Sequence, residues 1–183
     1  MKPRTDIEKA IQVAALILKS HRSLVMPHIK LLKLIYMAER RSWERRCGPI
    51  IDGTVAALKH GPVCEEVYDL IRHKHPQTRL WKKYISKVGA YSLHLIRDPG
   101  ISKLSPFEVE TVTAVAKEFK DKSEWEVVDE THKFPEWIKN NPGDSSNPIP
   151  LRDILEAVGL ADEAGELANE IEEIRTMRDV LCS

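Results

Sequence analysis

The segment Lys30–Arg40, with the sequence KLLKLIYMAER, most constrains what this chain can fold into. When the segment is drawn as a helix, apolar side chains fall on almost every side. Only burial by neighbours on several sides can hold such a helix in water. We therefore expect a central helix over residues 28–46, which Pro27 introduces and Cys47-Gly48-Pro49 ends.

The rest of the first 140 residues predicts a mainly α fold. Apolar side chains recur at helical spacing, and Ser105 and Ser123 each precede a glutamate by three positions, as in a capping box. Residues 55–58 are expected to form a short strand, and the runs 80–88 and 91–96 are typical of a hairpin. The expected fold is a single compact helical domain with a small β-hairpin or short sheet. Its further helices are expected at residues 6–20, 63–72, 105–120, 123–132 and 135–139.

A change in composition after residue 140 predicts a separate tail. Residues 141–149 are rich in Asn, Pro, Gly and Ser, which is typical of a linker between a domain at residues 1–140 and a C-terminal helical extension at 150–183. The extension has the pattern of a short helix followed by a longer, acidic helix. Apolar side chains of the longer helix form one narrow seam, which would pack either on the same domain or on a partner. The seam includes Leu167, Ile171 and Ile174.

The balance of charge bears on the kind of partner. The chain has 28 Lys and Arg residues and 28 Asp and Glu residues, so its formal net charge is zero. Binding to a nucleic-acid backbone needs a basic excess, so the balance argues against nucleic acid in general but leaves room for a local basic patch. Lys30, Lys33 and Arg40 share one face of the predicted central helix. We expect this stripe to be solvated or ion-paired, or to contact an acidic partner.

Cysteine usage and hydropathy favour a cytoplasmic protein without a membrane partner. Cys47, Cys64 and Cys182 show no C-x-x-C spacing, which argues against a disulfide framework or a zinc site. The run Ala10–Leu18 is the longest strongly apolar one, and it is about half the length that a bilayer requires. The first residues lead into a charged amphipathic helix rather than a signal peptide.

Candidate catalytic residues are few. Asp129 and His132 are three positions apart on one predicted helix, as a general base or a metal-ligand pair could be, but no H-E-x-x-H or EF-hand spacing surrounds them. A structural role at the end of that helix is the simpler interpretation. Cys64 lies at a predicted helix start, where a thiol pKa is lowered, although a lone cysteine is more often a buried apolar side chain. With no nucleotide-binding fingerprint either, we expect neither an enzyme nor a cofactor.

Several segments together resemble a known family. KLLKLIYMAER is followed by GPI at residues 48–50 and ALKHGPV at 57–63, and later by SEWEVVDETH at 123–132 and PEW at 135–137. Their order and spacing, over roughly residues 7–140, resemble the Panacea domain of SocA-like antitoxins and phage-associated GepA-like proteins. The positions that form this structural motif are Leu31, Leu34, Tyr36, Gly61, Pro62, Val63, Tyr68, Trp125, Asp129, His132 and Trp137.

The resemblance implies a mostly helical domain and an antitoxin of a type II-like toxin–antitoxin system. Such a protein would neutralise a cognate protein toxin, encoded by the adjacent gene, by direct binding. It could instead be an adaptor that hands the toxin to protease machinery, and a DNA-binding regulator of its own operon is a further alternative. The oligomeric state stays open. Candidate partner contacts are the basic residues Lys30 and Lys33, the turn residues Lys59 and His60, and the seam residues Leu167, Ile171 and Ile174.

Overall fold

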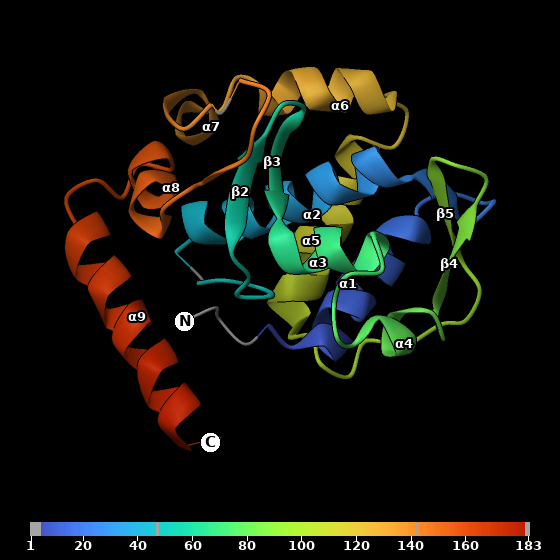
Figure 1. Ribbon diagram of the computed structural model, residues 1–183, viewed down its shortest axis with the longest axis horizontal. Coiled ribbons are helices and arrows are strands. Elements are labelled where there is room, and N and C mark those ends of the chain that lie inside the picture. The colour runs from blue at the N-terminus through green and yellow to red at the C-terminus, as the bar shows by residue number, and fades with distance from the viewer. Residues whose placement is uncertain (1–4, 47, 142, 182–183) are drawn as a thin grey trace.

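One helix, α2 (His28–Glu44), runs through the middle of the molecule and is covered by the other elements (Figure 1). The computed structural model describes residues 5–46, 48–141 and 143–181. In these residues nine helices accompany two small antiparallel sheets, so the expected mainly α class is confirmed. The other helices are α1 (Ile7–Leu18), α3 (Glu65–Ile71), α4 (Thr78–Trp81), α5 (Pro106–Glu118), α6 (Glu124–Thr131), α7 (Pro135–Lys139), α8 (Leu151–Ala157) and α9 (Ala164–Leu181).

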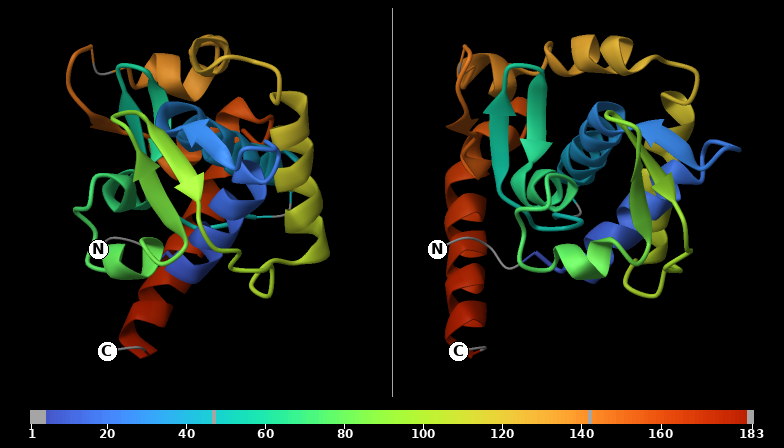
Figure 2. Two further views of the ribbon diagram at one scale, coloured as in Figure 1. Left: turned by 90° about the vertical axis from the view of Figure 1, so that its right-hand side faces the viewer. Right: turned by 45° about the vertical axis from the view of Figure 1, so that its right-hand side comes forward.

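The two sheets lie on different sides of α2 (Figures 1 and 2). One has the order β1-β5-β4, in which the expected hairpin β4–β5 pairs with a strand that the sequence did not predict, β1. The other has the order β3-β2-β6. The strands are β1 (Val25–Pro27), β2 (Val55–Leu58), β3 (Gly61–Cys64), β4 (Ile85–Val88), β5 (Ser92–Leu95) and β6 (Asn147–Pro148).

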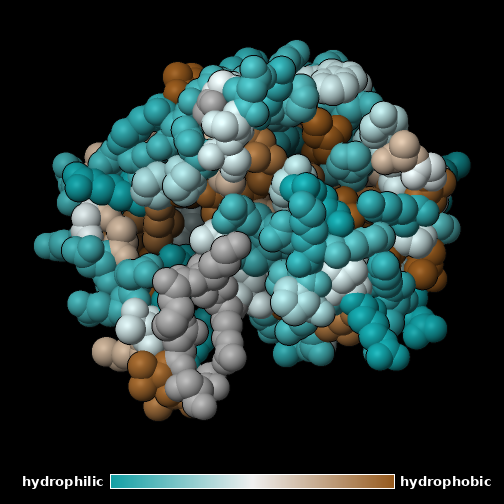
Figure 3. Space-filling view, viewed as in Figure 1, coloured by the Kyte–Doolittle hydropathy of each residue, from teal (hydrophilic) through white to brown (hydrophobic). Residues whose placement is uncertain are grey.

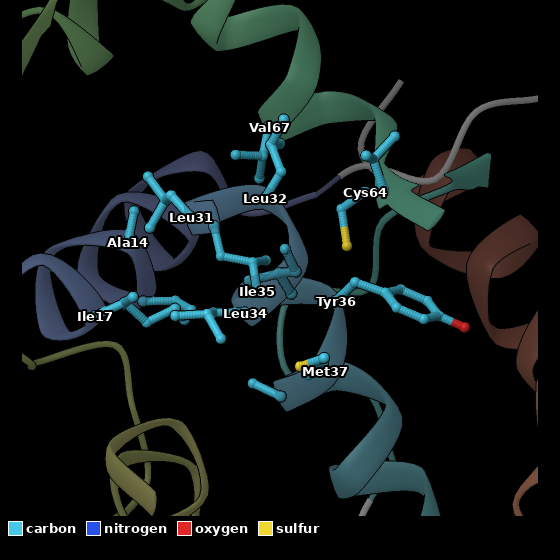
Figure 4. Packing of buried hydrophobic residues seen from close by; sticks show 14 of the residues in the cluster. Ala14, Ile17, Leu31, Leu32, Leu34, Ile35, Tyr36, Met37, Cys64 and Val67 are labelled. Atoms are coloured by element: carbon cyan, nitrogen blue, oxygen red, sulfur yellow. The ribbon is translucent and has the colours of Figure 1, made fainter. Parts of the chain in front are cut away.

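The hydrophobic core forms around α2. Leu31 and Leu34 are fully buried, and α1, α5, α6 and β3 all contact the helix. Figure 4 shows Ala14 and Ile17 of α1 beside the side chains of α2, with Val67 of α3 above them. Burial on several sides is the reason that a helix with so little polar surface is stable, as expected from its sequence.

Residues 61–64 form a strand, and the expectation of a helix from Val63 is wrong. Val63 pairs with Ala56, and α3 begins only at Glu65. Pro62 is tolerated because β3 is an edge strand of its sheet. The hairpin expectation needs a smaller correction, since residues 78–81 form α4 and the strand begins at Ile85.

The chain after residue 140 packs against the same core. Asn147 and Pro148 pair with β2 as strand β6. Apolar side chains of α8 and of the start of α9 join the buried cluster around α2, whereas the rest of α9 extends past the body of the molecule (Figure 2). The buried apolar residues of this region are Ile149, Ile154, Leu155, Leu160 and Ala164.

Both capping boxes are present. In each, the serine hydroxyl accepts a hydrogen bond from the backbone N–H of the glutamate, and the glutamate side chain accepts one from the serine N–H. They begin α5 and α6, which cover two sides of α2.

Gly61→Ala should destabilise the fold by about 3 kcal/mol. Gly61 has φ +99°, and an added Cβ would lie 2.4 Å from the hydroxyl oxygen of Thr131. This hydroxyl group is buried and donates a hydrogen bond to the Val128 carbonyl oxygen. Gly89→Ala is the matched control: its φ is +61° but nothing lies within 4 Å of the added Cβ, so the expected loss is about 1 kcal/mol. Urea unfolding of the two variants measures the difference, and equal losses would show that the contact with α6 is unimportant.

Candidate partner-binding surface

The structure buries both lysines that the sequence placed on a basic stripe. The ammonium group of Lys30 donates hydrogen bonds to the carbonyl oxygens of Lys120 and Lys122, and that of Lys33 donates to the Pro62 carbonyl at 3.0 Å. Their exposed fractions are 3% and 1%. The expected solvated stripe is therefore wrong for both residues, because the α5–α6 connection and β3 cover them. In this structure neither charge is available to a partner.

Burial changes the ionisation of these two lysines. Desolvation lowers the pKa of Lys33 to about 7 and also lowers the pKa of Lys30. Lys33 has a carbonyl oxygen as its hydrogen-bond partner and makes no ion pair within the described chain. Its amine is consequently close to half charged at neutral pH.

Three further polar side chains of α2, namely Tyr36, Glu39 and Arg40, also make hydrogen bonds inside the molecule. The Tyr36 hydroxyl and the Arg40 guanidinium both donate to one oxygen of Glu136 on α7, at 2.7 and 2.8 Å. The Glu39 carboxylate accepts from the backbone N–H groups of Ile50 and Ile51, and desolvation raises its pKa to about 7. These contacts hold α7 and the 50–51 segment on α2.

The Asp129–His132 pair does not form a catalytic arrangement. Asp129 is exposed, whereas the His132 ring stacks on Trp137 with centroids 4.1 Å apart and an interplanar angle of 11°. Partial burial and the nearby Lys33 lower the pKa of His132, which favours the neutral form of its ring. The Trp137 indole N–H donates to the Leu58 carbonyl, which ties α7 to β2. These contacts agree with the structural role expected for His132.

Cys64 is buried, and desolvation raises the pKa of its thiol well above the usual value. The sequence-based argument for a lowered thiol pKa is therefore wrong, because Cys64 ends a buried strand. Among the residues that the structure describes, no group of three or more His, Cys, Asp or Glu side chains could hold a metal ion. Nor does this part of the chain contain a helix long and apolar enough to cross a membrane.

The predicted turn residues Lys59 and His60 are exposed at the β2–β3 connection. Lys59 pairs with Asp144 at 2.8 Å. His60 meets the ring of Trp125 edge-on, with centroids 5.6 Å apart, and Trp125 is 55% exposed. His60 and Trp125 thus form a small exposed aromatic cluster beside the β2–β3 turn.

The seam on α9 is divided between the body and the surface. Leu167 and Ile171 are half-buried and, with Trp43 and Ile174, line a depression of about 350 Å³ between α9 and the end of α2. An ion pair of 2.6 Å between Arg175 and Asp52 fixes the middle of the helix to the body. The first half of the seam therefore packs on the chain itself.

From Ile174 to the end of the helix, the apolar edge of α9 is largely exposed. Ile174 is 48% exposed and Met177 63%, and Leu181 at the end of the helix is more exposed still. Figure 3 shows a hydrophobic area at the free end of α9. The partner contacts predicted from the sequence ended at Ile174, although apolar residues continue at spacings of three and four positions through Met177 and Leu181. Exposed acidic side chains flank this edge, namely Glu166, Glu170, Glu172 and Glu173.

Comparison with known proteins gives one finding. A family model described as "Antitoxin SocA-like, Panacea domain" matches residues 31–138. The match runs from α2 to α7 and contains all eleven positions of the structural motif, so the resemblance is confirmed. The helices α8 and α9 lie beyond it. Comparison with curated proteins and with solved structures gives no match.

The charge of buried Lys33 should make stability depend on pH. Its pKa is about 7 in the folded protein and 10.5 ordinarily, so above pH 7 the unfolded chain binds more protons and the free energy of unfolding rises with pH. Between pH 7 and 8.5 this contribution amounts to about 1.5 kcal/mol. Lys33→Met should abolish it.

The measurement is urea unfolding of both proteins across this pH range, with the exposed Lys117→Met as the matched control. The difference between wild type and Lys33→Met should change with pH, and the difference for the control should stay constant. A constant difference for Lys33→Met would contradict a lowered lysine pKa.

Proposed function

This chain belongs to the family of SocA-like antitoxins with a Panacea domain, and on that premise we propose that it is the antitoxin of a type II-like toxin–antitoxin pair. It would neutralise a cognate protein toxin, encoded by the adjacent gene, by direct binding in the cytoplasm. The family supports a non-enzymatic role. The burial of Cys64 and the stacking of His132 support it as well, because neither side chain is presented to a substrate.

One observation carries the choice of the binding surface: the uncovered apolar edge of α9. An amphipathic helix with an exposed apolar stripe is a common way to dock into a groove on a partner. Ile174, Met177 and Leu181 follow helical spacing on this edge. Their helix is anchored by the ion pair between Arg175 and Asp52, so little of it needs to become ordered on binding.

The charge of α9 indicates the chemistry of the toxin surface. The helix carries five acidic residues and two arginines, and both arginines pair with Asp52. Electrostatic complementarity then favours a toxin groove with an apolar floor and a basic rim. Because α9 lies outside the matched family region, differences in this helix between relatives would allow one scaffold to bind different toxins.

Co-expression with the adjacent gene tests the proposed function. The neighbouring product should arrest growth alone, and this chain should restore growth and copurify with the toxin at an undiminished toxin level. A harmless neighbour, or no copurification with no rescue, would refute the proposal. If growth is restored while a protease lowers the amount of toxin, the chain would instead be an adaptor that delivers the toxin to that protease.

Substitutions on α9 test the surface. Ile174→Asp and Met177→Asp should each weaken toxin binding by at least about tenfold, because a charge would enter the apolar centre of the contact. Ile101→Asp is the matched control, since Ile101 is 47% exposed against 48% for Ile174 but lies on the loop between β5 and α5. Titration calorimetry measures all three. Wild-type affinity in both α9 variants would place the toxin elsewhere.

A further inference from the structure

The neutral net charge of the chain conceals a strongly basic segment. Residues 72–97 contain seven Lys and Arg residues and no Asp or Glu, so the rest of the chain has 21 basic residues against 28 acidic ones. The segment forms α4 and the β4–β5 hairpin, at the opposite end of the molecule from the acidic helix α9 (Figure 1). All seven side chains are exposed: Arg72, Lys74, Arg79, Lys82, Lys83, Lys87 and Arg97. We call these seven the basic face.

The positive charges of the basic face are not neutralised by ion pairs to any residue that the structure describes. None of its seven side chains forms an ion pair with a described residue, whereas exposed cations such as Arg46 and Lys59 pair with Glu163 and Asp144. An ordinary solvated surface mixes the two signs of charge. The accumulation of unpaired positive charge therefore indicates a polyanionic partner.

Three side chains of the basic face line two depressions of the surface. His73 and Lys82 line one of about 260 Å³, and Arg72 lines the other, of about 190 Å³. Lys87 lines both, so the two depressions adjoin at this side chain. Partial desolvation, Lys82 and Lys87 all lower the pKa of His73, which agrees with a positive potential there.

An aromatic ring stands at the edge of this surface. Tyr91, in the turn of the hairpin, is 75% exposed. The backbone carbonyl oxygen of Tyr91 accepts a hydrogen bond of 2.8 Å from the backbone N–H of His28. The side-chain rings of the two residues also stack, with centroids 6.3 Å apart. The backbone of Tyr91 is thus fixed to the start of α2 while its ring is presented to solvent.

We propose that the basic face binds a single-stranded nucleic acid, with the lysines and arginines on its phosphates and Tyr91 stacked on a base. A positive groove lined with an accessible aromatic ring is the usual construction of such sites. The surface is less suited to a protein, because lysine is depleted at protein interfaces and four of the seven side chains are lysines. Since the basic face and α9 lie at opposite ends, the proposal does not depend on toxin binding.

Fluorescence anisotropy with labelled 15-nucleotide strands, one of RNA and one of DNA, tests the proposal at several salt concentrations. The variants are K82Q/K83Q/K87Q, Tyr91→Ala and, as a matched control with the same loss of charge, K117Q/K120Q/K122Q on α5 and the turns after it. The first should bind at least tenfold more weakly and lower the salt slope by about 2, because each lost phosphate contact removes about 0.7. Tyr91→Ala should lose roughly tenfold in affinity with the slope unchanged.

The two strands decide whether RNA or DNA is preferred. Absence of binding to both, an equal loss in the control variant, or tighter binding of the corresponding duplex would overturn the proposal. So would a loss of toxin binding in K82Q/K83Q/K87Q without any nucleic-acid binding by the wild type, because the face would then belong to a protein partner. Circular dichroism of each variant verifies that it is folded.

Discussion

The fold depends on the way in which the polar side chains of α2 are satisfied inside the protein. Four of these side chains bind four different neighbouring segments. Lys30 binds the α5–α6 connection, Lys33 binds strand β3, Glu39 binds the backbone at residues 50–51, and Arg40 binds helix α7. A buried charge without a partner costs several kcal/mol, so each contact is needed once its side chain is enclosed. The central helix therefore fixes the positions of its neighbours as well as packing against them.

This constraint also explains which parts of the molecule remain for binding. The family match over residues 31–138 includes the buried helix and the segments that its polar side chains hold. Side chains that form these internal hydrogen bonds, such as Lys33 and Tyr36, are buried and cannot contact another protein. The proposed binding surfaces lie away from it, on the apolar edge of the acidic helix α9 and on the basic face. Their opposite charges and separate positions would allow two partners to bind at once.

The sequence predicted the elements better than the environments of their polar residues. Helical periodicity and two capping boxes located α1, α2, α5 and α6, because those signals are local. The strand at Gly61–Cys64 was missed because its pairing with β2, and the contact of Gly61 with Thr131, are tertiary. Lys30 and Lys33 were placed on the surface by residue type alone. A helix that is apolar on almost every side has no solvent-exposed face, and this pattern in the sequence indicated that the two lysines are buried.

Hydrogen–deuterium exchange of the chain, free and bound to its toxin, tests most directly the claim that α2 is an internal scaffold and α9 the contact surface. The account predicts that toxin binding protects the backbone amides of residues 170–181 and leaves those of α2 unchanged. Protection at the β2–β3 turn and α6 with none on α9 would contradict it, and so would exchange in α2 that responds to the toxin.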